Sequence, residues 1–398
     1  MAHNTYERVQ QILDWAVAAD GIPGIVAEVH DADGTWFGTA GVADLTTGHR
    51  RQPGEYLHIG SSGKAFTAVT ALALAAEGRL SLEDPVNTWL PGVMETGGYD
   101  GDRITIRHLL NHTSGLFLTG LAPELQNSLA TRPTRIWTTS ELIELALSQP
   151  PVAEPGEQFL YANGGYYLAG AIIEKVTGST YAAEVERTVI RPLGLAHTHV
   201  RPADATGYPH PHPTGYVAGA LKDGVDPATL TAENWASMID YDKPPVDVTA
   251  LNTSWGWAAG GVVSTTEDLT RFLQAIATAG LLPPEQHHMM WTTVGGDRVV
   301  WLPHARYGLG VIEFDSADAH AVHRQAVEAG GVSVSEVTHL AFGDLVGRVR
   351  DPFGNVWWIQ TRIEDVTAEE MERRFGDPEF IAAMEYMQRP ETEIFPRS

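Results

Sequence analysis

The sequence predicts an α/β protein of the α+β kind, with an antiparallel sheet flanked by helices and a C-terminal βαβββ module. Three observations lead to this fold class. A helical pattern at the N-terminus is followed by two strand-like stretches with a short turn between them. Residues 82–247 alternate short helical patterns with Pro- and Gly-rich loops, which predicts a mostly helical insertion. After about residue 313, one helical pattern precedes three further strand-like stretches.

The composition is typical of a folded chain of more than one domain. Its 398 residues are too many for one ordinary core, and 43% hydrophobic against 19% charged residues is a globular balance. The formal net charge of −24 repels phosphate backbones, so nucleic acid is not an expected partner. Cysteine is absent, which excludes disulfides and thiol chemistry, and no run of 18 apolar residues predicts a membrane span.

The N-terminal residues bear on location. Residues 1–7 carry neither a basic stretch nor an apolar one and do not resemble a secretory signal. The sequence therefore predicts a cytoplasmic protein, and a secreted protein whose signal had been removed would show the same N-terminus.

The hydrophobic periodicity predicts a series of elements along the first three quarters of the chain. They are helix 5–19, strands 24–30 and 35–42, an extended segment 58–60, helices 65–77, 140–149 and 163–177, an irregular stretch 200–245, helix 267–277 and strand 307–314. A turn at residues 33–34 closes the hairpin, and Gly78 and Gly178 end two of the helices. Ser140 and Ser264 are expected to begin the helices that follow them.

Beyond residue 313 the pattern predicts one βαβββ unit with a helical tail. The expected elements are a helix at 317–329, strands at 332–338, 345–350 and 355–362, a turn at 351–354, and helices at 367–375 and 377–388. The strand at 307–314 supplies the first β of this unit. We therefore expect two domains, residues 1–313 and residues 314–398.

Ser61 and Lys64 are the strongest indication of chemistry. A serine followed three places later by a lysine at a helix start places both side chains on one face, one turn apart. A lysine amine in that position can take the serine proton, which every serine nucleophile must lose. Lysine is rare in this chain, with three others at positions 175, 222 and 243, and this rarity favours a chemical role for Lys64.

A second motif, Tyr161-Ala162-Asn163, lies far along the chain from Ser61. Taken alone, Tyr161 is a core aromatic residue and Asn163 a helix N-cap. The Y-x-N spacing combined with S-x-x-K favours a serine hydrolase in which the four polar side chains meet.

Residues 1 to about 312 resemble the serine β-lactamase-like family, which includes class C β-lactamases, D-alanyl-D-alanine carboxypeptidases and related esterases. The stretches that carry the resemblance are HIGSSGK (58–64), EGRLSLEDPV (77–86), LLNHTSGL (109–116), YAN (161–163), RPLGL (191–195), residues 258–269 and YGLG (307–310). The resemblance implies a cleft between the antiparallel sheet and the helical insertion.

The resemblance also implies a role for each site residue. Ser61 is the nucleophile that becomes acylated, and Lys64 is the amine that helps deprotonate it. Tyr161 passes a proton to the leaving group and later activates water, and Asn163 holds Lys64 and the substrate amide. Trp255 matches a position that lines the substrate cleft. The expected substrates are small esters, amides or D-amino-acid peptides, and neither a cofactor nor a metal is implied.

Histidines suggest two other kinds of site. His112 lies in the segment 112–115 and suits a catalytic triad, but the family resemblance makes that segment a structural turn. His210 and His212 suggest a metal site, yet their Pro-rich loop offers no fixed geometry, so a surface loop is expected.

One motif of the family is missing. Members follow the Y-G-L-G strand with another strand that bears K-T-G or H-x-G, whose backbone N–H completes the oxyanion hole. No lysine follows Lys243, and no histidine after Gly310 is followed by a glycine two places on.

The residues that follow resemble instead the vicinal-oxygen-chelate superfamily of glyoxalases and bleomycin-resistance proteins. The matching stretches are AVEAGG (326–331), FGD (342–344), GRVRDPFGNVW (347–357), EDVT (364–367) and EEM (369–371). Such proteins need two βαβββ modules for one cleft, and this chain has one. That shortage leaves open a homo-oligomer through the C-terminal half-module.

Three functions are consistent with these observations. The first is a serine hydrolase that forms an acyl-enzyme on a small-molecule or peptide substrate. The second is a catalytically impaired, hydrolase-like binding protein, because loss of one oxyanion-hole donor lowers turnover by about 10²–10³-fold. The third is a metal-dependent glyoxalase-like lyase or resistance protein that works through residues 314–398.

Overall fold

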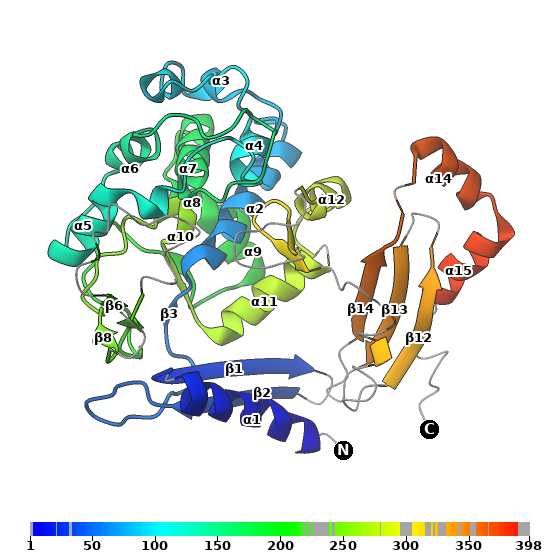
Figure 1. Ribbon diagram of the computed structural model, residues 1–398, viewed down its shortest axis with the longest axis horizontal. Helices are drawn as coiled ribbons and strands as arrows, with labels where there is room; N and C mark the ends of the chain where they lie inside the picture. Colours follow the sequence, from blue (N-terminus) through cyan, green and yellow to red (C-terminus); the bar gives the residue numbers. More distant parts are fainter. Residues whose placement is uncertain are drawn as a thin grey trace. The chain divides into compact units, whose positions relative to one another are not determined.

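The structure of the protein is a computed structural model, drawn as a ribbon in Figure 1. It describes residues 3–20, 22–31, 34–217, 220–222, 225, 239–240, 243–278, 280–294, 305–314, 320, 323–324, 332–340, 344–350, 356–364 and 366–388. The chain divides into two compact units. Unit 1 comprises Met1–Ile12, Val29–Gly38 and Phe314–Ser398, and unit 2 comprises Leu13–Glu28 and Thr39–Glu313.

The elements have the following bounds. The helices are α1 His3–Asp20, α2 Gly63–Ala76, α3 Val86–Trp89, α4 Ile106–Leu110, α5 Pro123–Thr131, α6 Thr139–Ala146, α7 Asn163–Thr177, α8 Tyr181–Val185, α9 Arg191–Leu193, α10 Trp257–Gly260, α11 Thr266–Ala277, α12 Pro284–Trp291, α14 Ala368–Phe375 and α15 Pro378–Gln388. The strands are β1 Gly24–Asp31, β2 Gly34–Gly41, β3 Leu57–His58, β4 His199–Val200, β5 Tyr216–Val217, β6 Ala220–Leu221, β7 Ile239–Asp240, β8 Val246–Asp247, β9 Val262–Ser264, β10 Ala305–Tyr307, β11 Ile312–Phe314, β12 Val332–His339, β13 Asp344–Arg350 and β14 Val356–Arg362. Single turns are η1 Gly60–Ser62, η2 Met94–Gly97, η3 Thr119–Leu121 and the π-helical η4 Glu186–Ile190. No helix in the described part of the chain is long and apolar enough to cross a membrane.

Helix α2 is the core helix of unit 2. It packs against α7, α10 and α12, and its residues from Gly63 to Leu72 are all buried. A helix that is apolar all round is buried on every face. Lys64 is the single charged residue of α2 and is only 1% exposed. Because the rest of α2 is uncharged and mostly buried, the Lys64 amine lies in the core of unit 2.

Helix α7 packs against α2, α4, α6 and α10 (Figure 1) and approaches α4 and α10 closely. A Cβ added at Gly165 would lie 2.6 Å from the carbonyl oxygen of Leu109, and one at Gly170 would lie 2.6 Å from the Cβ of Ala258. Glycine is needed where backbones approach this closely. This packing fixes the start of α7 at Asn163 and the segment before it.

A three-stranded antiparallel sheet, in the order β3-β9-β4, leads the chain into Ser61. Strand β3 pairs with β9 in the register Leu57↔Ser264. Directly after β3, the N–H of Ile59 donates to the carbonyl oxygen of Val262 at 3.1 Å. The chain is therefore held to β9 up to the residue before η1, and it enters α2 in a fixed direction.

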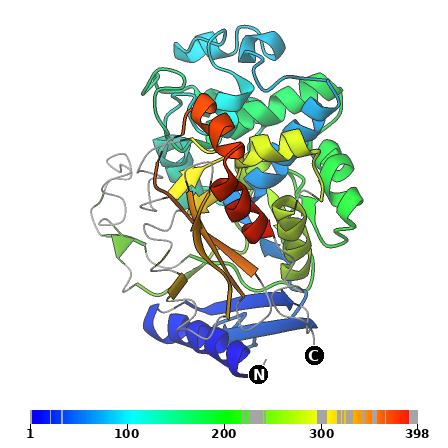
Figure 2. The same ribbon diagram turned by 90° about the vertical axis from the view of Figure 1, so that its right-hand side faces the viewer.

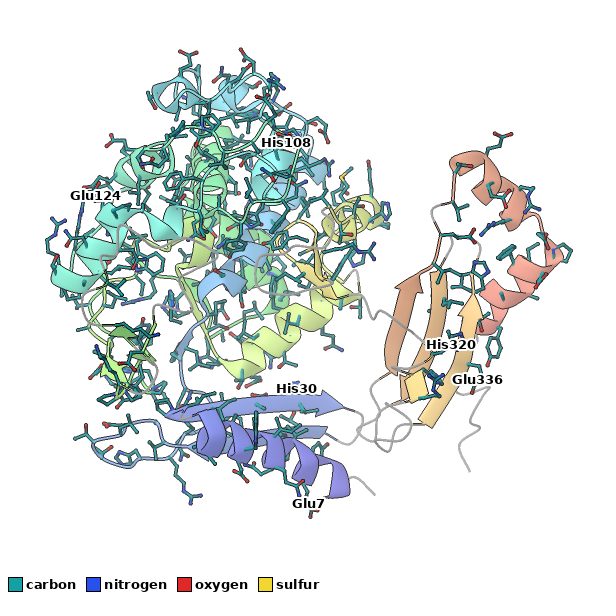
Figure 3. All side chains as sticks on the ribbon, in the orientation of Figure 1. Glu7, His30, His108, Glu124, His320 and Glu336 are labelled. Atoms are coloured by element: carbon teal, nitrogen blue, oxygen red, sulfur yellow. The ribbon has the colours of Figure 1, made fainter. Side chains whose placement is uncertain are left out.

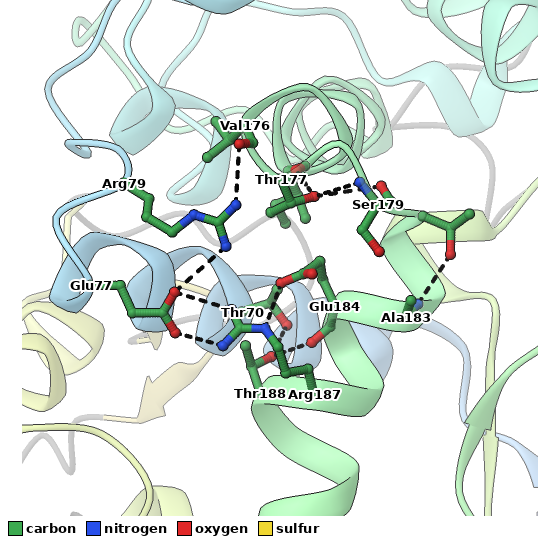
Figure 4. Close-up of polar contacts among 12 residues, drawn as sticks. Thr70, Glu77, Arg79, Val176, Thr177, Ser179, Ala183, Glu184, Arg187 and Thr188 are labelled. Carbon is green, nitrogen blue, oxygen red and sulfur yellow. Dashed lines mark hydrogen bonds and ion pairs between the residues drawn. The ribbon is translucent and has the colours of Figure 1, made fainter.

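A polar cluster joins the C-terminal end of α2 to α8 and η4 (Figure 4). Arg187 lies 2.6 Å from Glu77 and 2.9 Å from Glu184. Glu77 and Arg187 are 37% and 39% exposed, so their ion pair contributes only about 0–1 kcal/mol. Beside it, the buried hydroxyl groups of Thr70 and Thr188 lie 2.9 Å apart. That buried hydrogen bond is the more specific part of the contact.

Unit 1 contains a second three-stranded antiparallel sheet, in which β12, β13 and β14 follow one another in chain order. Helix α15 packs against β12, and Figure 2 shows this sheet with its two following helices. Leu340 and Val346 are buried there, and Ala383 and Tyr386 of α15 pack against them.

The fold class expected from the sequence is confirmed, since helices alternate with antiparallel sheets along the chain. The first hairpin, the helix that ends at Gly178, and the three C-terminal strands lie within one or two residues of their expected bounds. Among its described residues, the expected irregular stretch 200–245 contains only the last residue of β4 and the two-residue strands β5 to β7. The helix expected at 317–329, apart from residues 320 and 323–324, and the turn expected at 351–354 lie outside the described residues.

Two expected helix caps are wrong by one or two residues. Thr138, not Ser140, caps α6, because its hydroxyl accepts the Glu141 N–H while the Glu141 carboxylate accepts the Thr138 N–H at 2.8 Å. Thr265, not Ser264, caps α11. In both cases the cap is the hydroxyl that reaches the third N–H of the helix, and Ser264 is instead committed to β9.

The continuous strand expected at 307–314 is a hairpin, with β10 and β11 paired across a turn. Gly310 in this turn has a φ of 74°, which favours glycine. A Cβ at Gly310 would also lie 2.9 Å from the carbonyl oxygen of Lys64. The strand therefore bends where the chain passes close to α2.

Gly115→Ala is expected to lower the free energy of unfolding by more than Gly78→Ala does. Both glycines have positive φ, at 77° and 67°, so both variants carry a backbone strain of about 1–2 kcal/mol. A Cβ at Gly115 would in addition lie 2.1 Å from the carbonyl oxygen of Ala153, whereas Gly78 faces open space. Urea unfolding of the two variants measures the difference, expected to be about 1–3 kcal/mol. Equal losses would show that the close contact is relieved without strain.

Candidate active site

Ser61 and Lys64 lie where η1 passes into α2. Ser61 is exposed in the turn, and Lys64 is buried in the first turn of the helix. The Lys64 Nζ lies 3.2 Å from the Ser61 Oγ. The three-residue spacing thus brings the hydroxyl and the amine together on one helical face, as the sequence predicts.

The Lys64 amine has two further partners. Its Nζ donates to the Oδ1 of Asn163 and to the carbonyl oxygen of Ala259, both at 2.8 Å. A neutral amine has two hydrogens and one lone pair, and these two acceptors can take both hydrogens. The lone pair then remains for the hydroxyl of Ser61. The arrangement suits a base that removes a proton from Ser61.

Burial lowers the pKa of Lys64 from 10.5 to about 7. The cause is desolvation, because a charged amine in the core loses its hydration. A substantial fraction of the amine is therefore neutral near pH 7, and the neutral form can accept a proton.

Tyr161 lies beside this pair. Its side chain forms a hydrogen bond with Ser61, and the Lys64 Nζ lies 4.8 Å from the centroid of its ring. Desolvation raises the pKa of Tyr161 above its usual value of 10.0, while the hydrogen bond with Ser61 acts in the opposite direction. The phenol therefore keeps its proton at neutral pH and has it available for donation.

Asn163 stands at the start of α7 but does not cap it. The N-cap of α7 is Ala162, and Asn163 is the first residue inside the helix. The Asn163 side chain accepts a hydrogen bond from Lys64. Its amide therefore belongs to the polar site and does not cap the helix.

A cavity of about 330 Å³ lies at Ser61. Trp255, Tyr161 and Asn163 are among the residues that line it. An apolar wall of the cavity, the leucine wall, consists of Leu118, which directly precedes η3, and of Leu125 and Leu129 on α5. In the part of the chain that the structure describes, no residue with a formal charge lines this cavity.

The sequence does not single out the leucine wall. Leu125 and Leu129 recur at a four-residue spacing on α5, the helix whose first-turn Glu124 is labelled in Figure 3. This spacing is the one available signal, and it is equally typical of a core face. Gln126 Nε2 donates to the carbonyl oxygen of Gly120 at 2.6 Å, which holds α5 against η3.

The histidines have different surroundings. His112 lies next to the site, and its ring centroid is 4.3 Å from that of the Tyr161 ring. The rings of His210 and His212 lie 4.7 Å apart on their loop. Across the described residues, no three His, Asp or Glu side chains are grouped so that they could hold a metal ion.

The chain is similar in sequence to known proteins over most of its length. Residues 9–343 match the Beta-lactamase family model. Penicillin-binding protein 4* of Bacillus subtilis (strain 168) is 28% identical over 283 residues, which cover 69% of this chain and 57% of that protein. The Beta-lactamase of Escherichia coli (strain K12) is 28% identical over 233 residues, covering 57% and 58% respectively. The chain thus spans somewhat more than half the length of these curated relatives.

A solved structure extends the similarity. The crystal structure of a D-stereospecific amidohydrolase from Streptomyces sp. superposes with a TM-score of 0.67 at 30% identity. The superposition covers 94% of this chain and 98% of that one. Both this match and the family match continue beyond residue 313, where the sequence pattern changes.

Proposed function

Because the chain belongs to the beta-lactamase family, we propose that it is a serine hydrolase that forms an acyl-enzyme on Ser61. The proposed substrates are small esters, amides or D-amino-acid peptides. The names of its relatives support this range, since they include a penicillin-binding protein, a beta-lactamase and a D-stereospecific amidohydrolase.

One observation carries the proposal, namely the set of partners of the Lys64 amine. Two short hydrogen bonds, to Asn163 and to the Ala259 carbonyl, account for the two hydrogens of a neutral amine. The third neighbour, the Ser61 Oγ at 3.2 Å, faces the lone pair that remains. Nucleophile, base and a third group that orients the base are therefore within reach of one another.

In acylation, the Ser61 hydroxyl gives its proton to the Lys64 lone pair while its Oγ attacks the substrate carbonyl carbon. The negative charge of the tetrahedral intermediate develops at the N-terminal end of α2, whose dipole stabilises it. When the bond to the leaving nitrogen or oxygen breaks, the Tyr161 hydroxyl donates a proton to the leaving group. The Lys64 ammonium then returns a proton to Tyr161.

Deacylation uses the same groups in reverse. A water molecule in place of the leaving group gives one proton to the Tyr161 oxygen as the water oxygen attacks the acyl carbon, while Tyr161 passes its own proton to the Lys64 amine. The carbon–oxygen bond to Ser61 breaks, and the Ser61 Oγ recovers its proton from Lys64. The product is a carboxylic acid.

Mass spectrometry after incubation with acylating probes tests the proposal. A fluorophosphonate or a penicillin is expected to add one label per chain, located on Ser61 by peptide mapping. The Ser61→Ala variant is expected to remain unlabelled. An unlabelled wild-type protein whose esterase turnover survives in Ser61→Ala contradicts the proposal.

The second candidate function is a hydrolase-like binding protein with impaired turnover. It is favoured by the lack of any lysine after Lys243, which removes the K-T-G form of the third family motif. Labelling of Ser61 without hydrolysis of p-nitrophenyl acetate above the Ser61→Ala background would favour this candidate.

The leucine wall predicts a preference for apolar acyl groups. Burial of each methylene contributes about 0.8 kcal/mol, so kcat/KM is expected to rise about fourfold per added methylene until the cavity is full. Leu129→Asp places a carboxylate in that wall and is expected to abolish this gradient. Asn127→Asp adds the same charge to an exposed position of α5 and serves as the control. A series of p-nitrophenyl esters, from acetate to octanoate, measures the gradient, and a flat series for the wild type contradicts the assignment.

The organisation of the C-terminal region also remains a proposal. We propose a domain boundary near residue 313, a glyoxalase-like module over residues 314–398 and a homo-oligomer formed through it. The antiparallel strands β12 to β14 support the module, whereas a family match that runs to residue 343 weighs against that boundary. Sedimentation velocity of the full chain tests the oligomer. The cytoplasmic location remains a prediction.

A further inference from the structure

His112 has an uncommon backbone conformation directly beside Tyr161. It follows α4, its side chain is 1% exposed, and its φ is 62°. Few residues other than glycine adopt such a φ, although histidine and asparagine do so more often than most. A conformation of this kind persists where the surrounding contacts maintain it.

Both neighbours of Tyr161 in the chain donate hydrogen bonds to His112. The N–H of Leu160 donates to the His112 carbonyl oxygen at 2.8 Å. The N–H of Ala162 donates to the His112 Nδ1 at 3.1 Å. His112 thus forms hydrogen bonds with the residues on both sides of Tyr161. Its ring also contacts the Tyr161 ring, with the two centroids 4.3 Å apart.

The hydrogen bond to Nδ1 fixes the form of the imidazole. Because Nδ1 accepts, the proton of the neutral ring is on Nε2. The titratable groups around the ring are Lys64 on α2, Tyr161 before α7, Tyr166 on α7 and Tyr307 on β10. Desolvation and the charge of Lys64 hold the pKa of His112 well below its usual value of 6.5. The ring therefore stays neutral and keeps its bond to Ala162 at working pH.

We propose that His112 is a positioning residue, which orients the Tyr161 phenol toward Ser61 through its bond to Ala162 and its ring contact. The proposal rests on the serine hydrolase function proposed above. The phenol must reach both the Ser61 oxygen and the leaving group, and a displacement of about 1 Å lowers a rate about 10²-fold.

Two variants separate the side-chain acceptor from the backbone conformation. His112→Gly and His112→Asn both tolerate a positive φ, so neither strains the turn. The asparagine Oδ1 stands where Nδ1 stood and can accept from Ala162, whereas glycine offers no acceptor. We expect kcat to fall about 10²-fold in His112→Gly with KM changed by less than about threefold. His112→Asn is expected to recover at least about tenfold of that loss.

A double-mutant cycle tests whether His112 acts through the phenol. In a Tyr161→Phe background, His112→Gly is expected to lower kcat by less than about threefold further. A further loss of about 10²-fold in that background, or an unchanged kcat in His112→Gly alone, overturns the proposal. Phe159→Leu is the control for packing, since it removes a ring 5.6 Å from that of His112 and leaves the Ala162 bond intact. It is expected to lower the Tm with little effect on kcat.

A readout without catalysis distinguishes failure of this proposal from failure of the hydrolase function. In protein labelled with ¹³C on its tyrosine rings, the Tyr161 signal is identified by its loss in Tyr161→Phe. We expect this signal to broaden or split in His112→Gly and to stay single and sharp in Phe159→Leu. A single sharp signal in His112→Gly overturns the positioning role. This readout does not depend on catalysis, so it remains informative even when Ser61→Ala keeps its activity and the hydrolase function has failed.

Discussion

Ser61→Ala is expected to lower kcat/KM for a p-nitrophenyl ester by about 10⁴-fold or more, to near the uncatalysed background. The alanine side chain lacks the Oγ that attacks the carbonyl and that lies 3.2 Å from the Lys64 Nζ. Whatever rate remains comes from binding and from the N-terminal end of α2. Steady-state hydrolysis at pH 8 measures the change.

The neighbouring serine provides a matched control. Ser62 is also exposed, and it makes no side-chain hydrogen bond that caps α2. Ser62→Ala is therefore expected to keep kcat/KM within about threefold of the wild type. If Ser62→Ala removes the activity and Ser61→Ala keeps it, the nucleophile is assigned to the wrong serine.

Lys64→Met is expected to lower kcat by about 10³-fold and to abolish the acidic limb of the pH profile. Methionine fills nearly the same volume, but its thioether sulfur is far too weak a base to take the Ser61 proton. In the wild type, kcat/KM is expected to rise with pH and to be half-maximal near pH 7, because burial lowers the pKa of Lys64 to about 7. Activity should decline at high pH only once Tyr161 loses its proton, since desolvation raises its pKa above 10.0.

The same pKa shift has a consequence for stability. Between pH 7 and pH 10.5 the unfolded chain binds a proton at Lys64 that the folded protein does not bind. The free energy of unfolding contributed by this residue therefore rises with pH across that window, and below pH 7 the full penalty for the buried charge applies. Lys64→Met has no such penalty. Denaturant unfolding at several pH values should show the wild type gaining stability relative to Lys64→Met from pH 7 to pH 10, and a constant difference would mean that the pKa is not lowered.

The parts of the site that the sequence predicts are those set by local rules. Ser61 and Lys64 meet because a three-residue spacing at a helix start allows one geometry. Asn163 begins a helix whose apolar pattern and terminal Gly178 are visible in the sequence. Tyr161 is two residues before Asn163, so the position of this helix start also brings Tyr161 to the site. The pairing of the two motifs needed the family resemblance, because no local rule joins residues so far apart.

The remaining site features depend on contacts between distant segments. The Ala259 carbonyl accepts a hydrogen bond from Lys64 because α10 packs on α2. Every residue has a backbone carbonyl, so the sequence does not indicate which one accepts this bond. The leucine wall on α5 has the periodicity of any buried helix face. His112 is recognisable as part of a turn, but its bonds to residues 160 and 162 arise only from the tertiary fold.

The errors in the element boundaries have a local cause. At α6 and α11 several hydroxyl side chains stand in a row, and the one that reaches the third helical N–H becomes the cap. Residue order alone does not decide which one reaches it. The strand expected at 307–314 is interrupted at Gly310 because the chain must pass α2 there, a constraint that only the folded structure reveals.

The uncharged lining of the cavity at Ser61 has a consequence for the end of the catalytic cycle. Every hydrolysis of an ester or amide leaves a carboxylate where the acyl group stood, and among the described residues that line the cavity none has a formal charge, so positive charge faces the product only at the Ser61 end, from Lys64 and the start of α2. The chain as a whole carries a net charge of −24, which repels an anion as it departs. Accumulated carboxylic acid is therefore expected to inhibit the proposed hydrolase only weakly, which would allow turnover to continue at high product concentration.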